Sequence, residues 1–349
     1  MSDLHTRRAR LEPLLESVRS LADGTSERGK QARQRLAASS GLSPEGVELA
    51  ISRCLESRPT EIEIEALIRS TPTAHVAHVL LSANVFVAAH RAIAIGLVAS
   101  ETVRVRASRR EPEMAELLLA GAPNCFQLVD ELSPRAGDRL WAYGSDATLE
   151  EVAVTLPPGV ALHAHGTGFG ACVLDGSTKE ADLDALLTRL AEDVALFDQR
   201  GCLSPRVVLV NAGAGFARDV AKSLSLQLEK LQARVPRGHL EAAELAAIAA
   251  YRATASFTGE VFAAGLGFVS LGESATWPMP PTGRNVHVLS TSDVTKSLSS
   301  LRPMLTSCAF AGSAQLRNAL RAFLPGARVC SIGEMQSPPF DGPVDRREL

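Results

Sequence analysis

Hydrophobic and polar residues follow two different periods along this chain, and the period changes several times. Between residues 11 and 18 the apolar positions recur at the spacing of one helix face, and Ser43 with the following proline has the form of a helix start after a polar, basic stretch at 26–40. We interpret residues 1–68 as a helical segment that covers other parts of the fold or contacts a second copy, because helices with a polar face usually lie at the surface.

Short apolar, β-branched runs alternate with helical patterns over the rest of the chain. The predicted strands lie at 74–81, 102–106, 139–143, 206–210 and 285–289, and the predicted helices at 88–99, 147–154, 183–197, 220–233 and 240–251. This alternation is typical of an α/β fold. With 349 residues the chain is long enough for about two domains and a large core.

Composition and charge exclude several classes of protein. Hydrophobic residues make up 46% of the chain and charged residues 21%, a balance typical of folded globular proteins. The net charge of −3 disfavours nucleic-acid binding, which needs a basic face. No run of about 18 apolar residues predicts a membrane span, and the first residues lack the apolar core of a signal peptide, so we expect a cytoplasmic protein.

The cysteines and histidines show no disulfide or metal-ligand pattern. No two of the six cysteines have C-x-x-C spacing, and the eight histidines form no H-E-x-x-H motif, so we expect reduced thiols and no metal site. One cysteine stands apart, because Cys202 follows Gly201 on a turn between the predicted helix 183–197 and the strand 206–210. Glycine lets another group approach the sulfur closely, so Cys202 is either a nucleophile or a small buried hydrophobe.

The stretch from Phe197 to Pro205, FDQRGCLSP, resembles the nucleophile segment of the aldehyde dehydrogenase superfamily. It is most similar to that of the acyl-CoA reductases of the bacterial bioluminescence (fatty acyl reductase) type, in which Ser-Pro also soon follows the cysteine. Residues 305–312 and 333–342, the second of which contains GEMQSPP and DG, are similar to the same group. The resemblance covers about residues 70–349, and it implies that Cys202 carries the acyl group.

The resemblance also implies an oxyanion site. In the superfamily an asparagine follows a strand of the dinucleotide-binding domain, and Asn84 occupies the matching loop between 74–81 and 88–99. A developing oxyanion needs a fixed neutral donor in a dry site, which an asparagine amide supplies. The alternative is a loop asparagine that hydrogen-bonds its own backbone.

A basic cluster after the second predicted strand bears on the cofactor. By the resemblance, Arg106 takes the place of a lysine that touches the adenosine ribose, and Arg109 takes the place of a glutamate that pairs with the ribose hydroxyls. Guanidinium groups bind a 2′-phosphate that a carboxylate would repel, so Arg106, Ser108 and Arg109 favour NADPH (NADP+). The alternative is a solvated basic turn held by acids such as Glu111 and Glu113.

Two further elements match the superfamily in order. Gly144-Ser145 stands between a strand and a helix, where a helix N-terminus faces the dinucleotide. Residues 160–170 stand where oxidising members carry the glutamate that activates water, and the alignment puts His163 in its place. The loss of that glutamate disfavours oxidation to an acid and favours reduction of an acyl thioester. His163 and His165 are either catalytic or structural, because geometry decides a general base before residue type does.

Two features of the superfamily find no counterpart. The glutamate that grips the nicotinamide ribose should fall near the Pro-rich loop 277–283, and no residue matches it, Glu273 included. The chain is also shorter than a usual member, mainly in its helical N-terminus, and it stops at Leu349 just past Asp341-Gly342. We therefore expect the terminal strand that often completes oligomers to be missing. Whether the protein forms a homo-oligomer stays open.

The resemblance implies an aldehyde-dehydrogenase-like α/β fold with a helical segment at 1–68, a Rossmann-like dinucleotide-binding domain at 69–195, a catalytic domain with Cys202 at 196–310, and a segment at 311–349 that returns toward the cleft. It implies NADPH-dependent reduction of an acyl-CoA or acyl-carrier thioester to an aldehyde through a cysteine acyl-enzyme. Open alternatives are an acyl-phosphate or semialdehyde reductase or dehydrogenase of the same superfamily, a cysteine acyltransferase or thioesterase, and a catalytically silent scaffold.

Overall fold

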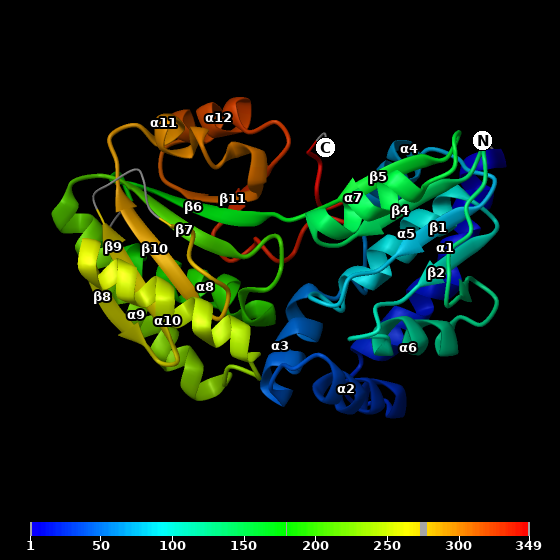
Figure 1. Ribbon diagram of the computed structural model, residues 1–349, viewed down its shortest axis with the longest axis horizontal. Coiled ribbons are helices and arrows are strands. Elements are labelled where there is room, and N and C mark those ends of the chain that lie inside the picture. The colour runs from blue at the N-terminus through cyan, green and yellow to red at the C-terminus, as the bar shows by residue number, and fades with distance from the viewer. Residues whose placement is uncertain (1, 179, 273–277, 348–349) are drawn as a thin grey trace.

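Two β-sheets with their covering helices form the structure, a computed structural model that describes residues 2–178, 180–272 and 278–347. The sheets lie side by side, and the C-terminal segment passes between them (Figure 1). Within the described residues no helix is both long and apolar enough to cross a membrane. The parallel sheets and their helices confirm the predicted α/β class.

The first sheet has five parallel strands in the order β3-β2-β1-β4-β5. Their bounds are β1 (Ala77–Leu80), β2 (Val103–Arg106), β3 (Gln127–Leu128), β4 (Arg139–Tyr143) and β5 (Ala161–His165). The chain order reverses between β1 and β4, and parallel α/β sheets bind ligands beyond the carboxyl ends of the strands at such a point. The loops that follow β1, β2 and β4 are therefore the ones that matter for function.

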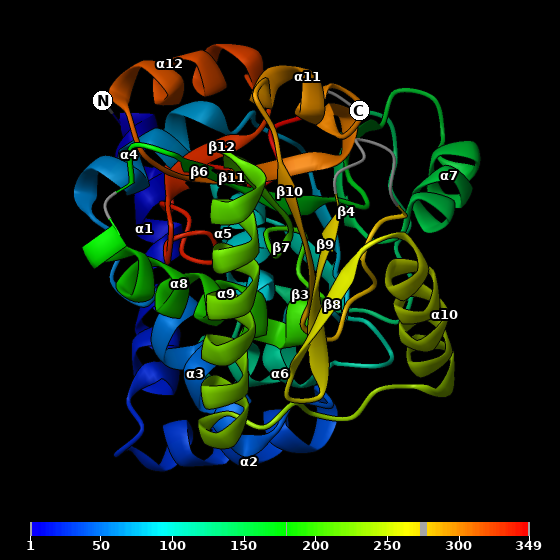
Figure 2. The same ribbon diagram turned by 90° about the vertical axis from the view of Figure 1, so that its left-hand side faces the viewer.

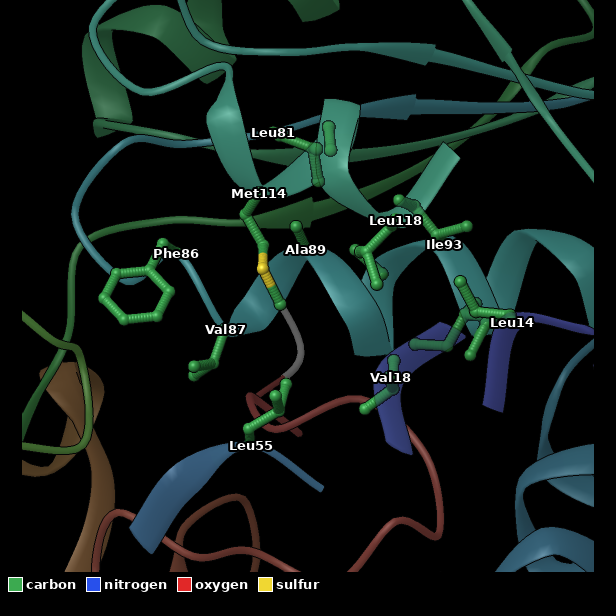
Figure 3. Close-up of a cluster of buried hydrophobic side chains, with 14 of the residues drawn as sticks. Leu14, Val18, Leu55, Leu81, Phe86, Val87, Ala89, Ile93, Met114 and Leu118 are labelled. Atoms are coloured by element: carbon green, nitrogen blue, oxygen red, sulfur yellow. The ribbon is translucent and has the colours of Figure 1, made fainter. Parts of the chain in front are cut away.

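Helices cover both faces of this sheet. On one face lie α5 (Ala88–Ala99) and α6 (Glu113–Gly121), and on the other lies α7 (Asp146–Thr155). The N-terminal helices are α1 (Ser2–Ala22), α2 (Glu27–Ser39), α3 (Pro44–Cys54) and α4 (Glu61–Ser70). Figure 3 shows the core that they share with the sheet domain, where Leu14 and Val18 of α1 gather with Ile93 of α5 and Leu118 of α6. The apolar spacing between residues 11 and 18 thus faces this core.

The second sheet has seven strands in the order β12-β11-β6-β7-β10-β9-β8, and only β8 runs antiparallel. Their bounds are β6 (Phe169–Asp175), β7 (Pro205–Asn211), β8 (Glu260–Ala264), β9 (Gly267–Gly272), β10 (Asn285–Ser290), β11 (Leu305–Ala311) and β12 (Arg328–Ser331). Alternate residues of the central strands face opposite layers, as strand geometry requires: Cys172 and Leu174 pack on one side, and Ala171 and Val173 on the other.

The helices of the second sheet form two layers, visible in Figures 1 and 2. One layer contains α8 (Glu180–Ala195) and α9 (Ala214–Arg234), and the opposite layer contains α11 (Val294–Ser299) and α12 (Ala314–Phe323). Helix α10 (Ala242–Thr258) packs beside β8 and β9 at one end of the sheet.

The strand pairing does not agree with the predicted end of the dinucleotide-binding domain at residue 195. The sequence assigned residues 69–195 to the dinucleotide-binding domain, yet β6 pairs with β7 and β11 of the second sheet, and α8 packs on α9. Because the chain crosses between the sheets in the short turn after β5, composition gives no signal there. Residues 311–349 add α12 and β12 to the second sheet, and the tail then returns to the first, where Arg91 of α5 donates to the carbonyls of Pro339 and Gly342 at 2.8 and 2.7 Å.

Candidate active site

Cys202 lies in the loop between the 3-10 turn η1 (Leu196–Gln199) and β7, at the amino end of a central strand. Strand β11 holds this loop, because the hydroxyl of Thr306 donates to the carbonyl of Cys202, and the hydroxyl of Ser307 donates to the carbonyl of Leu203 at 3.0 Å. Cys202 itself is half-buried and forms no disulfide. The main chain of the loop is thus fixed, and backbone hydrogen bonds of Cys202 and Leu203 favour the thiolate form of the cysteine.

The loop that carries Asn84, between β1 and α5, lies directly against the cysteine segment. The rings of Phe86 and Phe197 meet edge to face, with 5.6 Å between their centroids. A Cβ at Gly201 would lie 3.2 Å from Cγ2 of Val85, so the close approach of the two loops favours glycine. Asn84 is exposed, and its amide has no hydrogen-bond partner within the described residues. The structure therefore brings the predicted nucleophile segment and the predicted oxyanion loop together.

Two charged residues of the C-terminal tail set the electrostatics at the thiol. Asp345 and Arg347 form a buried ion pair at 2.6 Å, and Arg347 also donates to the carbonyls of Thr167 and Pro303 at 3.2 and 2.9 Å. Burial raises the pKa of Cys202 to about 11, the Asp345 carboxylate adds to this, and the Arg347 guanidinium opposes it. The resting thiol is therefore protonated at neutral pH. No sequence motif marks this pair, because only the fold brings the tail toward the cysteine loop.

His163, predicted at the place of the superfamily's general base, has a structural setting. Its ring stacks on Trp141 at 4.9 Å between centroids, and its Nε2 accepts a hydrogen bond from Arg139 at 3.2 Å. Burial and the Arg139 charge both lower the pKa of His163. A general base needs a free lone pair within reach of the proton, and here the guanidinium occupies that lone pair. The geometry does not join His163 to the cysteine.

His165, the last residue of β5, has surroundings that link it electrostatically to the cysteine, unlike His163. It stacks on Tyr143 at 4.6 Å between centroids, and it interacts with the charges of Asp345 and Arg347, which also act on Cys202. Burial lowers the pKa of His165 to about 4, so the ring is neutral at neutral pH. Its Nε2 is buried without a hydrogen-bond partner in the part of the chain that the structure describes. The family resemblance assigns the place of the general base to His163 and not to His165.

The basic cluster predicted to bind the cofactor begins at the carboxyl end of β2. Arg106 and Ser108 are half-buried, Arg109 is exposed, and no ion pair holds either arginine within residues 2–178, 180–272 and 278–347. The two acids that were expected to neutralise the cluster are engaged elsewhere. Glu111 accepts a hydrogen bond from the backbone of α6 at 3.1 Å, and Glu113 pairs with an arginine of α2. The arginines are therefore available to an anionic ligand.

Gly144 and Ser145 lie where β4 turns into α7, across the strand-order reversal from the Asn84 loop. The hydroxyl of Ser145 caps the helix and accepts from the backbone N–H of Thr148 at 3.3 Å. The carboxylate of Asp146, in the first turn of α7, accepts a hydrogen bond from the backbone N–H of Thr167 at 2.7 Å. Backbone donors at the start of a helix suit phosphate groups, and this helix start belongs to the ligand-binding edge of the first sheet.

A buried carboxylate fixes the point from which the tail departs. Asp193 of α8 accepts from the backbone N–H groups of Gly333 and Met335 at 2.7 and 3.2 Å, and burial raises the pKa of Asp193 to about 7. Gln336 donates to the hydroxyl of Ser204 at 2.9 Å, two residues from the cysteine. The GEMQ stretch, noted in the sequence only for its resemblance, thus connects the tail to the cysteine loop.

The Pro-rich loop is only partly described. Glu273 and Trp277 lie outside the described residues, and from residue 278 onward the loop leads into β10. The backbone N–H of Gly283 donates to the carbonyl of Asp198, just before the cysteine, at 3.0 Å. Across the described ranges no three His, Cys, Asp or Glu side chains are grouped so that they could hold a metal ion.

Comparisons with known proteins agree with this architecture. The family model described as acyl-CoA reductase (LuxC) matches residues 125–346, and no curated protein matches the chain. A benzaldehyde dehydrogenase from Corynebacterium glutamicum aligns with a TM-score of 0.70 and 15% identity over 94% of this chain and 84% of that one. An oxidoreductase from Marinobacter aquaeolei aligns with a TM-score of 0.75 and 11% identity over 96% and 79%. A methylmalonate-semialdehyde dehydrogenase from Oceanimonas doudoroffii gives 0.72 and 11% over 95% and 79%.

These similarities bear on different predictions. At such low identities the solved structures show the fold alone, and they confirm the predicted aldehyde-dehydrogenase-like α/β fold. The family model spans more than half of the chain, including Cys202 and most of the tail, and it confirms the predicted resemblance. Family and fold together support acyl reduction and a nicotinamide cofactor. The chain belongs to the acyl-CoA reductase (LuxC) family, and its enzyme class is that of an NAD(P)-dependent oxidoreductase.

Proposed function

We propose that the protein uses NADPH to reduce an acyl thioester, carried by CoA or by an acyl-carrier protein, to an aldehyde through an acyl-enzyme on Cys202. One observation supports this most strongly: the cysteine loop meets the Asn84 loop between the two sheets, through the rings of Phe86 and Phe197. A two-step acyl reduction requires a nucleophile and a neutral hydrogen-bond donor near the cofactor, and these two loops carry them beside the ligand-binding edge of a Rossmann-like sheet.

In the first half-reaction Cys202 loses its proton, and its sulfur forms a bond to the acyl carbon. The bond between that carbon and the carrier sulfur breaks, and the departing thiolate takes up a proton, so charge is conserved. The amide of Asn84 and the backbone N–H of Cys202 donate to the carbonyl oxygen as it becomes an oxyanion. His165 is a weak base for this proton, because burial lowers its pKa to about 4.

In the second half-reaction the acyl carbon on Cys202 would take up a hydride, the chemistry that NADPH held by Arg106, Arg109 and the start of α7 would supply, and the acyl-enzyme would become a thiohemiacetal anion. The bond between carbon and the Cys202 sulfur then breaks, the aldehyde leaves, and the thiolate returns. His163 stands at the place of the water-activating glutamate and has its lone pair filled by Arg139, so it does not direct water to the acyl-enzyme. The acyl-enzyme therefore persists until it is reduced.

The ligand-binding edge of the first sheet fits NADPH. Arg106 and Arg109 have no ion-pair partner among the described residues, and Ser108 lies between them. A ribose 2′-phosphate brings nearly two negative charges, for which guanidinium groups are matching donors. The start of α7, capped by Ser145, offers backbone donors to the pyrophosphate. We place the reaction in the cytoplasm, because the cysteines of the described chain are free thiols.

Absorbance at the nicotinamide band tests this proposal. The protein is mixed with NADPH and a panel of acyl-CoAs, and aldehyde and free CoA are measured alongside. Consumption of NADPH with matching release of aldehyde and CoA supports the proposal. Release of CoA without consumption of NADPH makes the protein an acyltransferase or thioesterase, and turnover with acyl phosphates alone makes it an acyl-phosphate reductase. A protein that does none of these is a scaffold.

A further inference from the structure

Three consecutive residues just before the cysteine loop have a left-handed backbone. Phe197, Asp198 and Gln199 have φ values of 54°, 49° and 66°. Residues other than glycine rarely adopt this conformation, because the Cβ atom comes too close to the following carbonyl oxygen. A run of three such residues persists only where the surrounding structure holds it firmly, and such strain is concentrated at functional sites.

Asp198 is held by contacts from two loops. Its Oδ1 accepts from Nη2 and Nε of Arg284 at 2.7 and 3.0 Å, and its Oδ2 accepts from the backbone N–H of Gly238 at 2.9 Å. Its main-chain carbonyl accepts from the N–H of Gly283 at 3.0 Å. Both charged side chains are buried, and Arg284 also donates to the carbonyl of Val235 at 2.7 Å. The ion pair therefore joins the turn to the loops before α10 and before β10.

Gln199 holds the end of the same turn. Its Nε2 donates to the carbonyls of Pro205 and Asn285, both at 2.7 Å, and its Oε1 accepts from the N–H of Asn285 at 2.8 Å. Because Pro205 has no N–H, the side chain supplies hydrogen bonds between the starts of β7 and β10 that the main chain cannot. The turn is thus fixed to the strand that follows the cysteine and to its neighbour.

The direction of this turn decides where the cysteine lies. The phenyl ring at its start packs against the Asn84 loop, and Gly201-Cys202 follows at its end. We propose that Asp198 and Arg284 are a positioning pair, whose buried ion pair holds the left-handed turn that aims Cys202 at the Asn84 loop. This inference rests on the proposed function of Cys202 as the acyl carrier.

The positioning pair can be separated from a purely stabilising one. Replacing a buried ion pair by apolar residues of similar volume is often neutral for stability, whereas removing one partner leaves an uncompensated charge and is strongly destabilising. Variants that change both residues therefore remove the clamp without leaving an uncompensated buried charge. Glycine adopts positive φ without strain, so glycine at 198 relieves the backbone that the clamp holds, while alanine does not.

The test compares two double variants, Asp198→Ala/Arg284→Met and Asp198→Gly/Arg284→Met. Each is incubated with an acyl-CoA, and the acyl adduct on Cys202 is followed by intact mass. We expect the adduct to form about 10- to 100-fold more slowly in the alanine variant, the loss that a small misplacement of a reacting group produces, and to be partly restored in the glycine variant. The matched control is Arg218→Met/Glu260→Gln, an exposed pair at 2.7 Å between α9 and β8, which should react like wild type.

Each outcome decides the matter. Wild-type rates in a folded alanine variant overturn the proposal, and so does a glycine variant that is no faster than the alanine variant. Loss of cooperative unfolding in both variants makes the pair a stability element and also overturns it. Folding of the glycine variant alone supports it. Alkylation of Cys202 by iodoacetamide repeats the comparison without substrate. A wild type that is alkylated but takes up no acyl group refutes the proposed function. In that case the alkylation rates of the variants still test the positioning pair.

Discussion

Asp345→Asn should make Cys202 more reactive, and Arg347→Met should make it less reactive. The two side chains form a buried ion pair, and their charges act on the pKa of Cys202 in opposite directions. Only the thiolate form of a cysteine reacts with an alkylating agent, so a change in pKa appears directly in the rate. A merely structural role of the tail would slow or speed both variants together.

The size of the effect follows from the acidity of the thiol. With a pKa of about 11, Cys202 is about one part in a thousand thiolate at pH 8. A nearby charge shifts a pKa by about one unit or more, and below the pKa each unit changes the thiolate fraction tenfold. Asp345→Asn should therefore raise the alkylation rate at about pH 8 by roughly tenfold, and Arg347→Met should lower it by a similar factor. In the wild type the rate should climb with pH without a plateau until about pH 11.

Iodoacetamide labelling with peptide mass mapping, from about pH 7 to 10, measures these rates at Cys202 separately from the other cysteines. Arg346→Met is the matched control, because Arg346 belongs to the same tail but pairs with Asp341 in a more exposed setting. A plateau near pH 8 in the wild type, or rates that change in the same direction in both variants, would show that these charges do not govern the thiol.

Three other predictions concern the oxyanion loop, the cofactor and the tail anchor. Asn84→Ala should lower turnover by about 10²–10³-fold with NADPH affinity unchanged, and unchanged turnover would make Asn84 a plain loop residue. Arg109→Glu should weaken NADPH binding by roughly 10- to 100-fold and narrow its advantage over NADH, whereas equal affinities of the wild type for both cofactors contradict the assignment. Asp193 has a pKa of about 7 in the folded protein, above its ordinary value of 3.8. At a pH between these two values, the folded protein therefore holds a proton that the unfolded chain has lost. The free energy of unfolding should fall by up to about 4 kcal/mol as pH rises through this window, and urea melts of Asp193→Asn should lose that slope.

Much of the fold follows from local patterns. The strands and helices around Asn84 and Gly144 are strongly periodic or bounded by turn residues, and the structure contains them in the predicted order. The Cys202 turn also carries a local signal, because glycine and cysteine stand between a helical pattern and a β-branched run. These features depend on neighbours in sequence, which the sequence itself displays.

The contacts that shape the site are long-range, and the sequence does not display them. The charges of Asp345 and Arg347 act on Cys202 only through the fold, and no spacing relates residues 345 and 202. Whether His163 or His165 keeps a free ring nitrogen depends on Arg139, which donates to Nε2 of His163 and is far from both histidines in sequence. The left-handed turn at 197–199 contains no glycine, so nothing local indicates it.

The central claim is that Cys202 carries the acyl group, and intact mass spectrometry tests it most directly. Wild type, Cys202→Ala and the buried-cysteine controls Cys172→Ala and Cys308→Ala are incubated with an acyl-CoA in the absence of NADPH. If Cys202 carries the acyl group, the wild type and both controls gain one acyl mass, and Cys202→Ala gains none. Loading of Cys202→Ala to the wild-type level would contradict the claim.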